Sequence, residues 1–294
     1  MLRLLTFIIL IALLAVPAGI AAPAPPAAAP TSTRSAPGGR TRIAAPITLP
    51  LARGLVSRYL NAVGGRVALW DLKAFSAHAT ISIDGTKTSG ELELAFRKPD
   101  LMFIRLDLGE LGTSEVAADG RIAWELTTTA EGDSAEVISM SDAKRRRREL
   151  NWFELALRLT DDAKIFRTIA PAEFEGHPCW EIQKTTRKGN EERIFIDRND
   201  FLLRGIRMIE SGPLGEYEVT LSFRDWRRVK SLTLFHQMVI SRNNIDLVVT
   251  FDKISLDPIP SQTFVQPPRI RQLLKDMNEL EKMVDPDGRK DDTP

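Results

Sequence analysis

The sequence contains few of the residues that cross-linking and metal binding require. Among its 294 residues there are one cysteine and three histidines. Because Cys179 has no partner in the chain, an intramolecular disulfide is excluded, and no cysteine near Ala21 is available to accept a lipid. A zinc site would use most of His78, His177 and His236, yet no HxxxH or CxxC spacing occurs. The sequence therefore predicts no metal and no cofactor.

Signatures of catalysis are also missing. The most suggestive pair is His177 and Cys179, but Pro178 between them favours the entry to a strand over a metal or nucleophile site. There is no GxSxG motif, and Gly64-Gly65 lacks the lysine and the spacing of a phosphate-binding loop. The 39 acidic residues leave a glycosidase-like carboxylate pair open, although no pair stands out. We interpret the chain as a protein that is not an enzyme.

Neither sign of charge is in excess. The chain has 40 lysines and arginines against 39 aspartates and glutamates, which gives no general reason to expect a nucleic acid partner. Its hydrophobic content of 43% is ample for a packed core. The length fits one large β domain or two small ones.

The amino terminus predicts export. Arg3 precedes an uncharged run over residues 4–16 that is apolar except for Thr6. This run is too short to span a bilayer comfortably but is typical of a secretory signal. Gly19 and Ala21 occupy the two small-residue positions before a cleavage site. We expect a signal peptide over residues 1–21 and a soluble periplasmic product. An uncleaved membrane anchor is the alternative.

Three further regions follow the leader. Residues 22–50 are rich in alanine and proline and predict an extended linker. Periodic apolar patterns fill residues 51–268, which we expect to form one β-barrel domain. Residues 269–294 predict a helix followed by a charged tail.

Alternation of apolar and polar residues dominates the central region. The segment 51–63 predicts a helix, and from Phe75 onward the period changes to that of strands. Turn signals such as Asn243-Asn244 separate most of the strands. So many sequential strands are expected to curl into a full or partial barrel. The candidate strands are 75–83, 90–97, 101–108, 121–128, 164–170, 179–186, 191–197, 202–209, 216–226, 233–241 and 245–254.

Two helices are expected to interrupt or end this sheet. Residues 142–160 begin with a basic run and continue with apolar side chains around most of the helix circumference, so this helix needs burial on more than one side. We predict that it is a mobile lid, which loosens when a bound guest leaves. A helix permanently docked in the core is the alternative. A single apolar stripe after Pro267-Pro268 consists of Ile270, Leu273, Leu274, Met277, Leu280 and Val284.

Short motifs spread over residues 51–268 carry a family resemblance. They are YLNAVGG at 59–65 with Ala68, Leu69 and Leu72; Asp119-Gly120 with Ala123-Trp124; Phe195-Ile196-Asp197 before Phe201-Leu202; FRDWR at 223–227; and FVQP at 264–267. Together they resemble the LolA/LolB-like superfamily, whose members sort outer-membrane lipoproteins.

The resemblance implies a mainly β fold with covering helices, namely a half-open antiparallel β-barrel of about eleven strands around an apolar cavity. Members of the superfamily carry acylated lipoproteins or bind related lipids in the periplasm. The chain is therefore expected to be a periplasmic carrier that holds a lipid or the acyl chains of a lipoprotein, with transient contact to a membrane or an envelope protein. An envelope sensor or scaffold that binds a protein partner through the same fold is the alternative.

An apolar cavity also has a physical basis in the strand pattern. Inward side chains of an open barrel can be apolar without being covered by other protein groups. Burial of an acyl chain releases about 0.8 kcal/mol per methylene, so it needs no special polar chemistry. The alternative is that these side chains fill a closed core. The candidate lining residues are Ile104, Leu106, Trp124, Trp152, Phe153, Phe195, Met208, Phe223 and Phe235.

The basic run is a candidate surface for a membrane or a client. Cations close to an anionic bilayer contribute about 1 kcal/mol each, and this run directly precedes the apolar part of the predicted lid. A solvated helix end is the alternative. The run comprises Lys144, Arg145, Arg146, Arg147 and Arg148.

Overall fold

The computed structural model describes residues 48–212 and 215–284. The predicted signal peptide, almost all of the linker and the charged tail lie outside these residues. Within them, thirteen strands form one sheet. The strands are β1 (Ala74–Ile83), β2 (Ser89–Arg97), β3 (Leu101–Asp107), β4 (Thr113–Asp119), β5 (Ala123–Thr129), β6 (Gly132–Ile138), β7 (Ala163–Phe174), β8 (His177–Thr186), β9 (Glu191–Asp197), β10 (Leu203–Gly212), β11 (Gly215–Val229), β12 (Leu232–Arg242) and β13 (Ile245–Ser255).

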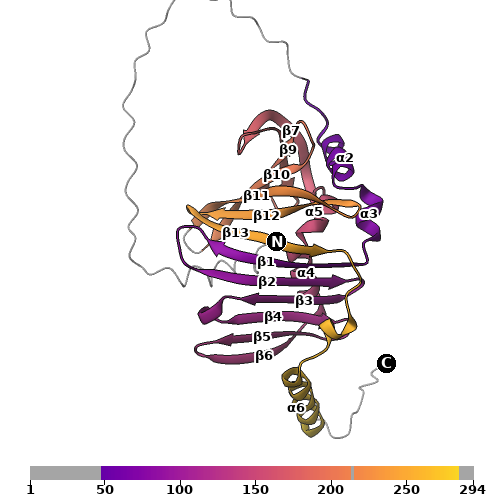
Figure 1. Cartoon of the computed structure of the whole chain (residues 1–294), viewed down its shortest axis with the longest axis vertical. Coiled ribbons are helices and arrows are strands. Elements are labelled where there is room, and N and C mark those ends of the chain that lie inside the picture. Colours follow the sequence, from indigo (N-terminus) through magenta and orange to yellow (C-terminus); the bar gives the residue numbers. More distant parts are fainter. Residues whose placement is uncertain (1–47, 213–214, 285–294) are drawn as a thin grey trace, which may run out of the picture.

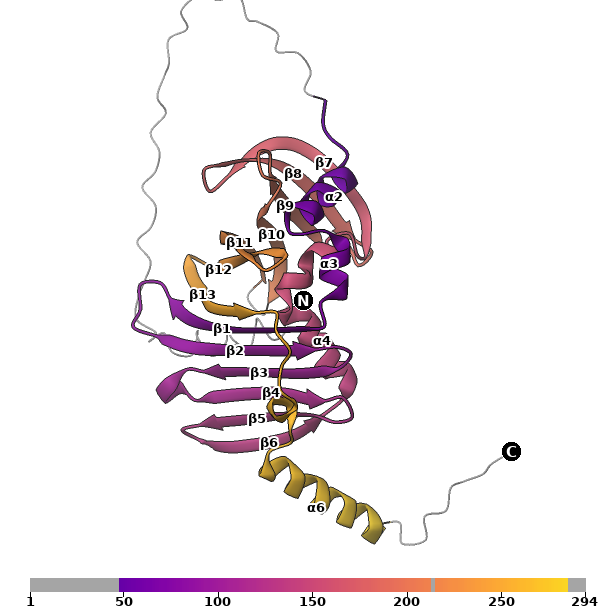
Figure 2. The same ribbon diagram turned by 45° about the vertical axis from the view of Figure 1, so that its right-hand side comes forward.

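The sheet is antiparallel throughout and open. Its order is β6-β5-β4-β3-β2-β1-β13-β12-β11-β10-β9-β8-β7, so the first and last strands pair at the centre, and β6 and β7 form the two edges (Figure 1). Strands β7 to β9 arch away from the plane of β1 to β6 (Figure 2). This curvature gives the sheet a concave and a convex face.

The fold class is confirmed, but the sheet has thirteen strands instead of about eleven. The sequence reading missed β4 and β6. β6 is an edge strand in which no residue is fully buried, so it lacks the alternation that marks a strand. β4 does alternate, but Ser114, Ala117 and Ala118 are too small to produce a strong apolar pattern.

Helices and short turns lie against the sheet or at its end. Over the described residues, none of the helices has both the length and the hydrophobicity to cross a membrane. They are α2 (Ala52–Ala62), α3 (Arg66–Asp71), α4 (Met140–Leu150), α5 (Leu155–Arg158) and α6 (Pro268–Val284), with the 3-10 turns η1 (Gly109–Leu111), η2 (Trp152–Glu154) and η3 (Ser261–Phe264).

The prediction of one continuous helix over residues 142–160 is wrong. α4 ends at Leu150, because Asn151 has φ −82° and ψ 67°, outside the helical region. The side chain of Arg158 donates hydrogen bonds to the carbonyls of Arg148 and Asn151 at the break, and the Asn151 carbonyl also accepts the backbone N–H of Glu154. The segment therefore consists of α4, the turn η2 and the short helix α5.

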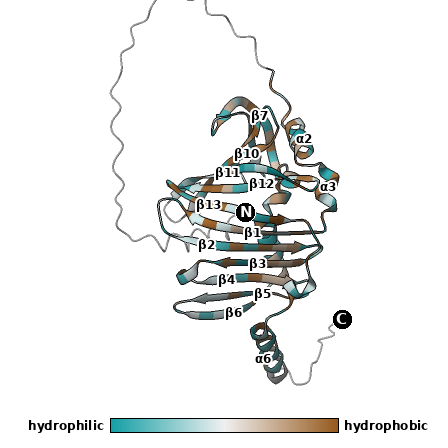
Figure 3. Ribbon diagram, viewed as in Figure 1, coloured by the Kyte–Doolittle hydropathy of each residue, from teal (hydrophilic) through white to brown (hydrophobic). Residues whose placement is uncertain are grey.

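The core lies on the concave face. Along β1, Ala77, Ala79 and Ile81 are buried in the main cluster, whereas Thr80 and Ser82 are exposed on the other face. Side chains of α2, α4, η2 and α5 belong to the same cluster. The segment after β13 runs across the opposite face toward α6 (Figure 2). Figure 3 shows the strands as a patchwork of hydrophobic and hydrophilic residues, as this alternation requires.

Candidate binding site on the concave face

Large apolar side chains from several strands meet on the concave face. Because successive residues of a strand point to opposite faces, residues two apart, such as Ile104 and Leu106 of β3, share this side. Met208 of β10, Phe223 of β11 and Phe235 of β12 belong to the same cluster, and none of the five is more than 9% exposed. The structure thus brings these predicted residues together.

Two aromatic side chains enter this cluster from outside the sheet. Trp152 and Phe153 open the turn η2 and are 3% and 5% exposed. The ring centroid of Phe153 lies 4.3 Å from that of Phe75, 4.9 Å from Phe235 and 5.2 Å from Phe251. Trp152 meets Phe251 edge-on at 6.4 Å. Trp152 and Phe153, which we call the aromatic plug, therefore lie within the aromatic cluster of the concave face.

The sequence reading overlooked two of the rings that receive the plug. Phe75 is the second residue of β1 and has the same parity as Ala77 and Ala79, and Phe251 has the same parity as Val249 in β13. Both are 2% exposed. Their alternation with polar neighbours was a sufficient signal, so counting parity along every strand would have found them.

Trp124 and Phe195 do not lie with the other candidate residues. Trp124 packs against Ala117 and Ile270 of α6, whereas its neighbour Ala123 belongs to the concave cluster. Phe195 stacks on Phe174 with 4.7 Å between ring centroids. Both side chains have the outward parity of their strands and lie on the convex face. Their size and hydrophobicity did not reveal which face they occupy.

Polar contacts hold the plug at its two ends. Arg158 donates to the carbonyl of Arg148 at 2.6 Å and to that of Asn151 at 2.8 Å. Burial, together with the nearby charge of Arg148, lowers the pKa of Arg158. Arg148 also pairs with Asp161 at 2.8 Å across an exposed surface. Since exposed pairs contribute about 0–1 kcal/mol, burial of the two rings is the main attachment of the plug.

Each cation of the basic run has a partner. The pair between Arg146 and Glu125 is the least exposed and ties α4 to β5. Lys144, Arg145 and Arg148 are more than half exposed. The contacts are Lys144 to Asp100 at 3.3 Å, Arg145 to Asp142 at 2.6 Å, Arg146 to Glu125 at 2.7 Å, Arg147 to the carbonyl of Pro99, and Arg148 to Asp161 at 2.8 Å.

The histidine and cysteine singled out in the sequence lie on the convex side. Cys179 is buried, and burial together with the charge of Asp197 raises the pKa of its thiol to about 12. Nδ1 of His177 lies 3.2 Å from the Asp197 carboxylate. A thiol with this pKa is a poor nucleophile at neutral pH. Within residues 48–212 and 215–284, no group of three or more His, Cys, Asp or Glu side chains is arranged to hold a metal ion.

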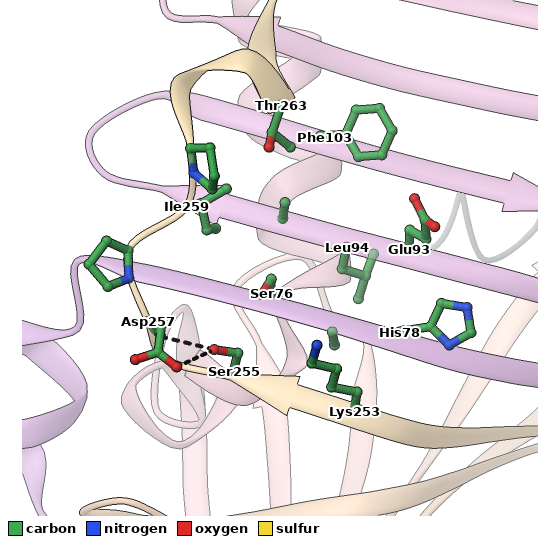
Figure 4. A pocket seen from close by; sticks show the side chains of 14 residues that line it. Ser76, His78, Glu93, Leu94, Phe103, Lys253, Ser255, Asp257, Ile259 and Thr263 are labelled. Carbon is green, nitrogen blue, oxygen red and sulfur yellow. Dashed lines mark hydrogen bonds between the residues drawn. The ribbon is translucent and has the colours of Figure 1, made fainter.

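A hollow of about 320 Å³ with a mixed polar and apolar lining lies on the convex face, beneath the segment 256–264 (Figure 4). His78, Glu93 and Lys253 are among its lining residues. Nδ1 of His78 lies 3.6 Å from the Asp252 carboxylate. Half of its lining residues are apolar, among them Leu94, Phe103 and Ile259, but the charged groups set between them disfavour an apolar guest. The concave face, with its aromatic cluster, is therefore the candidate site.

An open, curved antiparallel sheet with helices over an apolar concave face is the architecture that the sequence motifs imply. No family model matches the sequence, and no curated protein matches it. The similar solved structures include a LolA superfamily protein from Nitrosomonas europaea (10% identity over 74% of this chain and 98% of that chain, TM-score 0.47). They also include a DUF1329 family protein from Desulfovibrio piger (13% identity over 73% of this chain and 97% of that chain, TM-score 0.49). A third is a putative outer membrane lipoprotein-sorting protein domain from Vibrio parahaemolyticus (10% identity over 76% of this chain and 99% of that chain, TM-score 0.47).

Two of these structures belong to proteins described as a LolA superfamily protein and an outer membrane lipoprotein-sorting protein domain. At identities of 10% to 13% the comparisons concern the fold and not the ligand. The guest of this chain has to be inferred from its own side chains.

Proposed function

We propose that this protein binds an apolar guest, a lipid or the acyl chains of a lipoprotein, on the concave face and carries it through the periplasm. The observation that supports the proposal is the aromatic plug. Trp152 and Phe153 lie among the rings of β1, β12 and β13, yet they belong to a segment that is not part of the sheet. A guest that enters between these rings has to displace them.

Displacement of the plug is energetically accessible. Exposure of the two rings costs about 1.5–3 kcal/mol each, and an acyl chain gains about 0.8 kcal/mol per buried methylene. A chain of ordinary length therefore offsets the loss. The segment also has a weak point at Asn151, whose side-chain oxygen is buried without a hydrogen-bond partner among the described residues. We therefore propose that entry of the guest loosens the segment, which is the opposite of the sequence-based expectation that it loosens when the guest leaves.

The remaining parts of the proposal concern export and membrane contact. The uncharged and mostly apolar run over residues 4–16 supports export, with removal of the leader after Ala21. Amino-terminal sequencing of the mature protein tests this, and a sequence that starts at Met1 in a membrane fraction would overturn it. The exposed cations Lys144, Arg145 and Arg148 lie next to the plug and support transient contact with anionic headgroups.

The test of the carrier function is the guest itself. The protein is purified from its periplasm without detergent, extracted with organic solvent and analysed by mass spectrometry. We expect a lipid in stoichiometric amount, and an apolar fluorescent probe should bind to the delipidated protein. Absence of both the lipid and probe binding would contradict the carrier function and favour a sensor or scaffold that binds a protein partner.

A further inference from the structure

Two arginines line a hollow of about 470 Å³ at the rim of the concave face. Arg58 comes from α2, and Arg198 follows β9 in the turn before β10. Trp180 and Phe201 form apolar walls of the same hollow, and both also pack against the concave cluster. Two walls of the hollow therefore border the apolar cluster where we place the guest. Its full lining is Arg58, Pro178, Trp180, Arg198, Asn199 and Phe201.

Each guanidinium is positioned by an aromatic ring. The guanidinium carbon of Arg58 lies 4.9 Å from the ring centroid of Phe201, and that of Arg198 lies 4.7 Å from the centroid of Trp180. A ring that contacts the face of a guanidinium fixes its plane but leaves the N–H donors at its edge free. Two preorganised sets of donors therefore border one hollow.

The two arginines also lack acidic partners. Among residues 48–212 and 215–284, no carboxylate forms an ion pair with Arg58 or Arg198, and none lines the hollow. The acids nearest in sequence are occupied, because Asp197 and Asp200 both accept hydrogen bonds from Arg204. The hollow consequently carries two uncompensated positive charges.

We propose that this hollow binds a phosphate group. Arginine matches the tetrahedral oxygens of phosphate through paired N–H donors, and the side-chain amide of Asn199 can add a further donor. The source of the phosphate is a lipid headgroup, whose chains extend onto the concave face, or free phosphate. The claim that the phosphate belongs to a lipid depends on the proposed carrier function. The claim that the hollow binds phosphate does not depend on it.

The basic run near the plug is less suited to this role. Lys144, Arg147, Arg148 and Arg158 line a smaller hollow of about 210 Å³. Lys144 and Arg148 pair with carboxylates, and Arg147 and Arg158 donate to backbone carbonyls. A ligand there would have to break existing hydrogen bonds and ion pairs. A ligand of Arg58 and Arg198 would not have to displace a carboxylate.

Three probes separate the sources of the phosphate. Dioctanoylphosphatidic acid carries both chains and phosphate, dioctanoylglycerol carries the same chains without phosphate, and inorganic phosphate has no chains. Binding of each to the delipidated protein is measured by calorimetry below the concentration at which the lipids aggregate. We expect the phosphatidic acid to bind about tenfold more tightly than the diacylglycerol.

Variants assign the effect to the two arginines. In Arg58→Gln/Arg198→Gln, the affinity for the phosphatidic acid should fall to that for the diacylglycerol, which should not change. Because both arginines are exposed, this variant should fold, and circular dichroism checks it. Arg53→Gln is the matched control, since Arg53 is exposed on the same helix and does not line the hollow. The double variant Arg58→Lys/Arg198→Lys should keep only part of the affinity, because lysine retains the positive charge but lacks the paired N–H donors of the guanidinium.

The outcomes distinguish the two proposals. Equal binding of both lipids, unchanged in the double variant, would overturn the phosphate site and leave the carrier function intact. Binding of inorganic phosphate that the double variant abolishes, without any binding of the diacylglycerol, would support the site and contradict the carrier function. If none of the three probes binds, both proposals fail.

Discussion

The two faces of the sheet are built from the same strands but differ in how their apolar side chains are grouped and covered. On the concave face these side chains form one extensive cluster beneath α2, α4, η2 and α5. On the convex face they form small separate clusters, such as the one of Trp124 with Ile270 and the one of Phe174 with Phe195. Among the described residues, the concave cluster is the most extensive apolar cluster, and we therefore place the proposed lipid chain there.

The coverings differ as well. The convex pair Phe174 and Phe195 lies under the guanidinium of Arg207, at 5.4 Å and 5.1 Å from the two ring centroids. Arg207 is a sheet residue whose position is fixed by strand pairing. The plug residues Trp152 and Phe153 lie outside the sheet. We infer that the convex clusters serve stability and that the concave cluster serves binding.

The largest expected effect follows from removal of a ring that the sheet fixes in the concave cluster. Phe235 contacts the rings of Phe153, Phe223, Trp226 and Phe251. Phe235→Ala should lower the free energy of unfolding by about 3–5 kcal/mol, because the strand cannot move to fill the cavity. Denaturant unfolding measures it, and a loss below about 1 kcal/mol would show that this cluster is not packed as described.

A smaller loss is expected at the plug. Phe153→Ala should cost about 2 kcal/mol, less than a ring fixed in the sheet, because the segment around η2 can open locally. The same variant should bind an apolar fluorescent probe several-fold more tightly, since the guest no longer competes with this ring. Lower stability without tighter binding of the probe would place Phe153 in ordinary core.

The convex face is tested at Gly205. A Cβ at this position would lie 2.1 Å from Cζ of Phe174 and 2.8 Å from the carbonyl oxygen of Leu221. Gly205→Ala should therefore displace the Phe174 ring and cost about 1–3 kcal/mol. Binding of the apolar probe should stay at the wild-type level, and a clear change in probe binding would contradict the separation of the two faces.

The smallest expected effect is a change in the pH dependence of stability caused by Glu175. Hydrogen bonds from Arg224 hold the pKa of Glu175 on the convex face below its ordinary value, and Ser222 also donates to this carboxylate. The folded-state pKa is lower than the unfolded one, so the stabilisation is present above the unfolded pKa and is lost as the pH falls through the folded pKa.

Glu175→Gln should consequently reduce stability by a few tenths of a kcal/mol, about the value of a partly exposed pair, at pH 7 but not at low pH. Unfolding curves at a series of pH values down to about pH 3 measure this difference. Because Glu175 lies away from the concave face, binding of an uncharged probe should be the same in variant and wild type. A stability difference that grows in acid would contradict the sign of the pKa shift.

The sequence predicted most of the fold. Seven of the nine candidate residues lie together on the concave face, and strand parity explains why the other two were misplaced. Alternation identified strands such as β1 and β12, and the motif resemblance gave the open antiparallel architecture. Alternation did not reveal β6, because this edge strand has no buried face. Trp124 and Phe195 were assigned by their size, whereas the register of their strands places them on the convex side. The break at Asn151 has no sequence signal comparable to a proline or a glycine.

The most direct measurement is hydrogen exchange of the plug segment with and without a bound lipid. Delipidated protein and protein saturated with dioctanoylglycerol are compared by mass spectrometry. We expect peptides that contain Trp152 and Phe153 to exchange about tenfold faster in the lipid complex, because the guest displaces the rings, while peptides of β1 and β3 stay unchanged. Equally slow exchange of the plug in both samples, or slower exchange in the complex, would contradict binding by displacement.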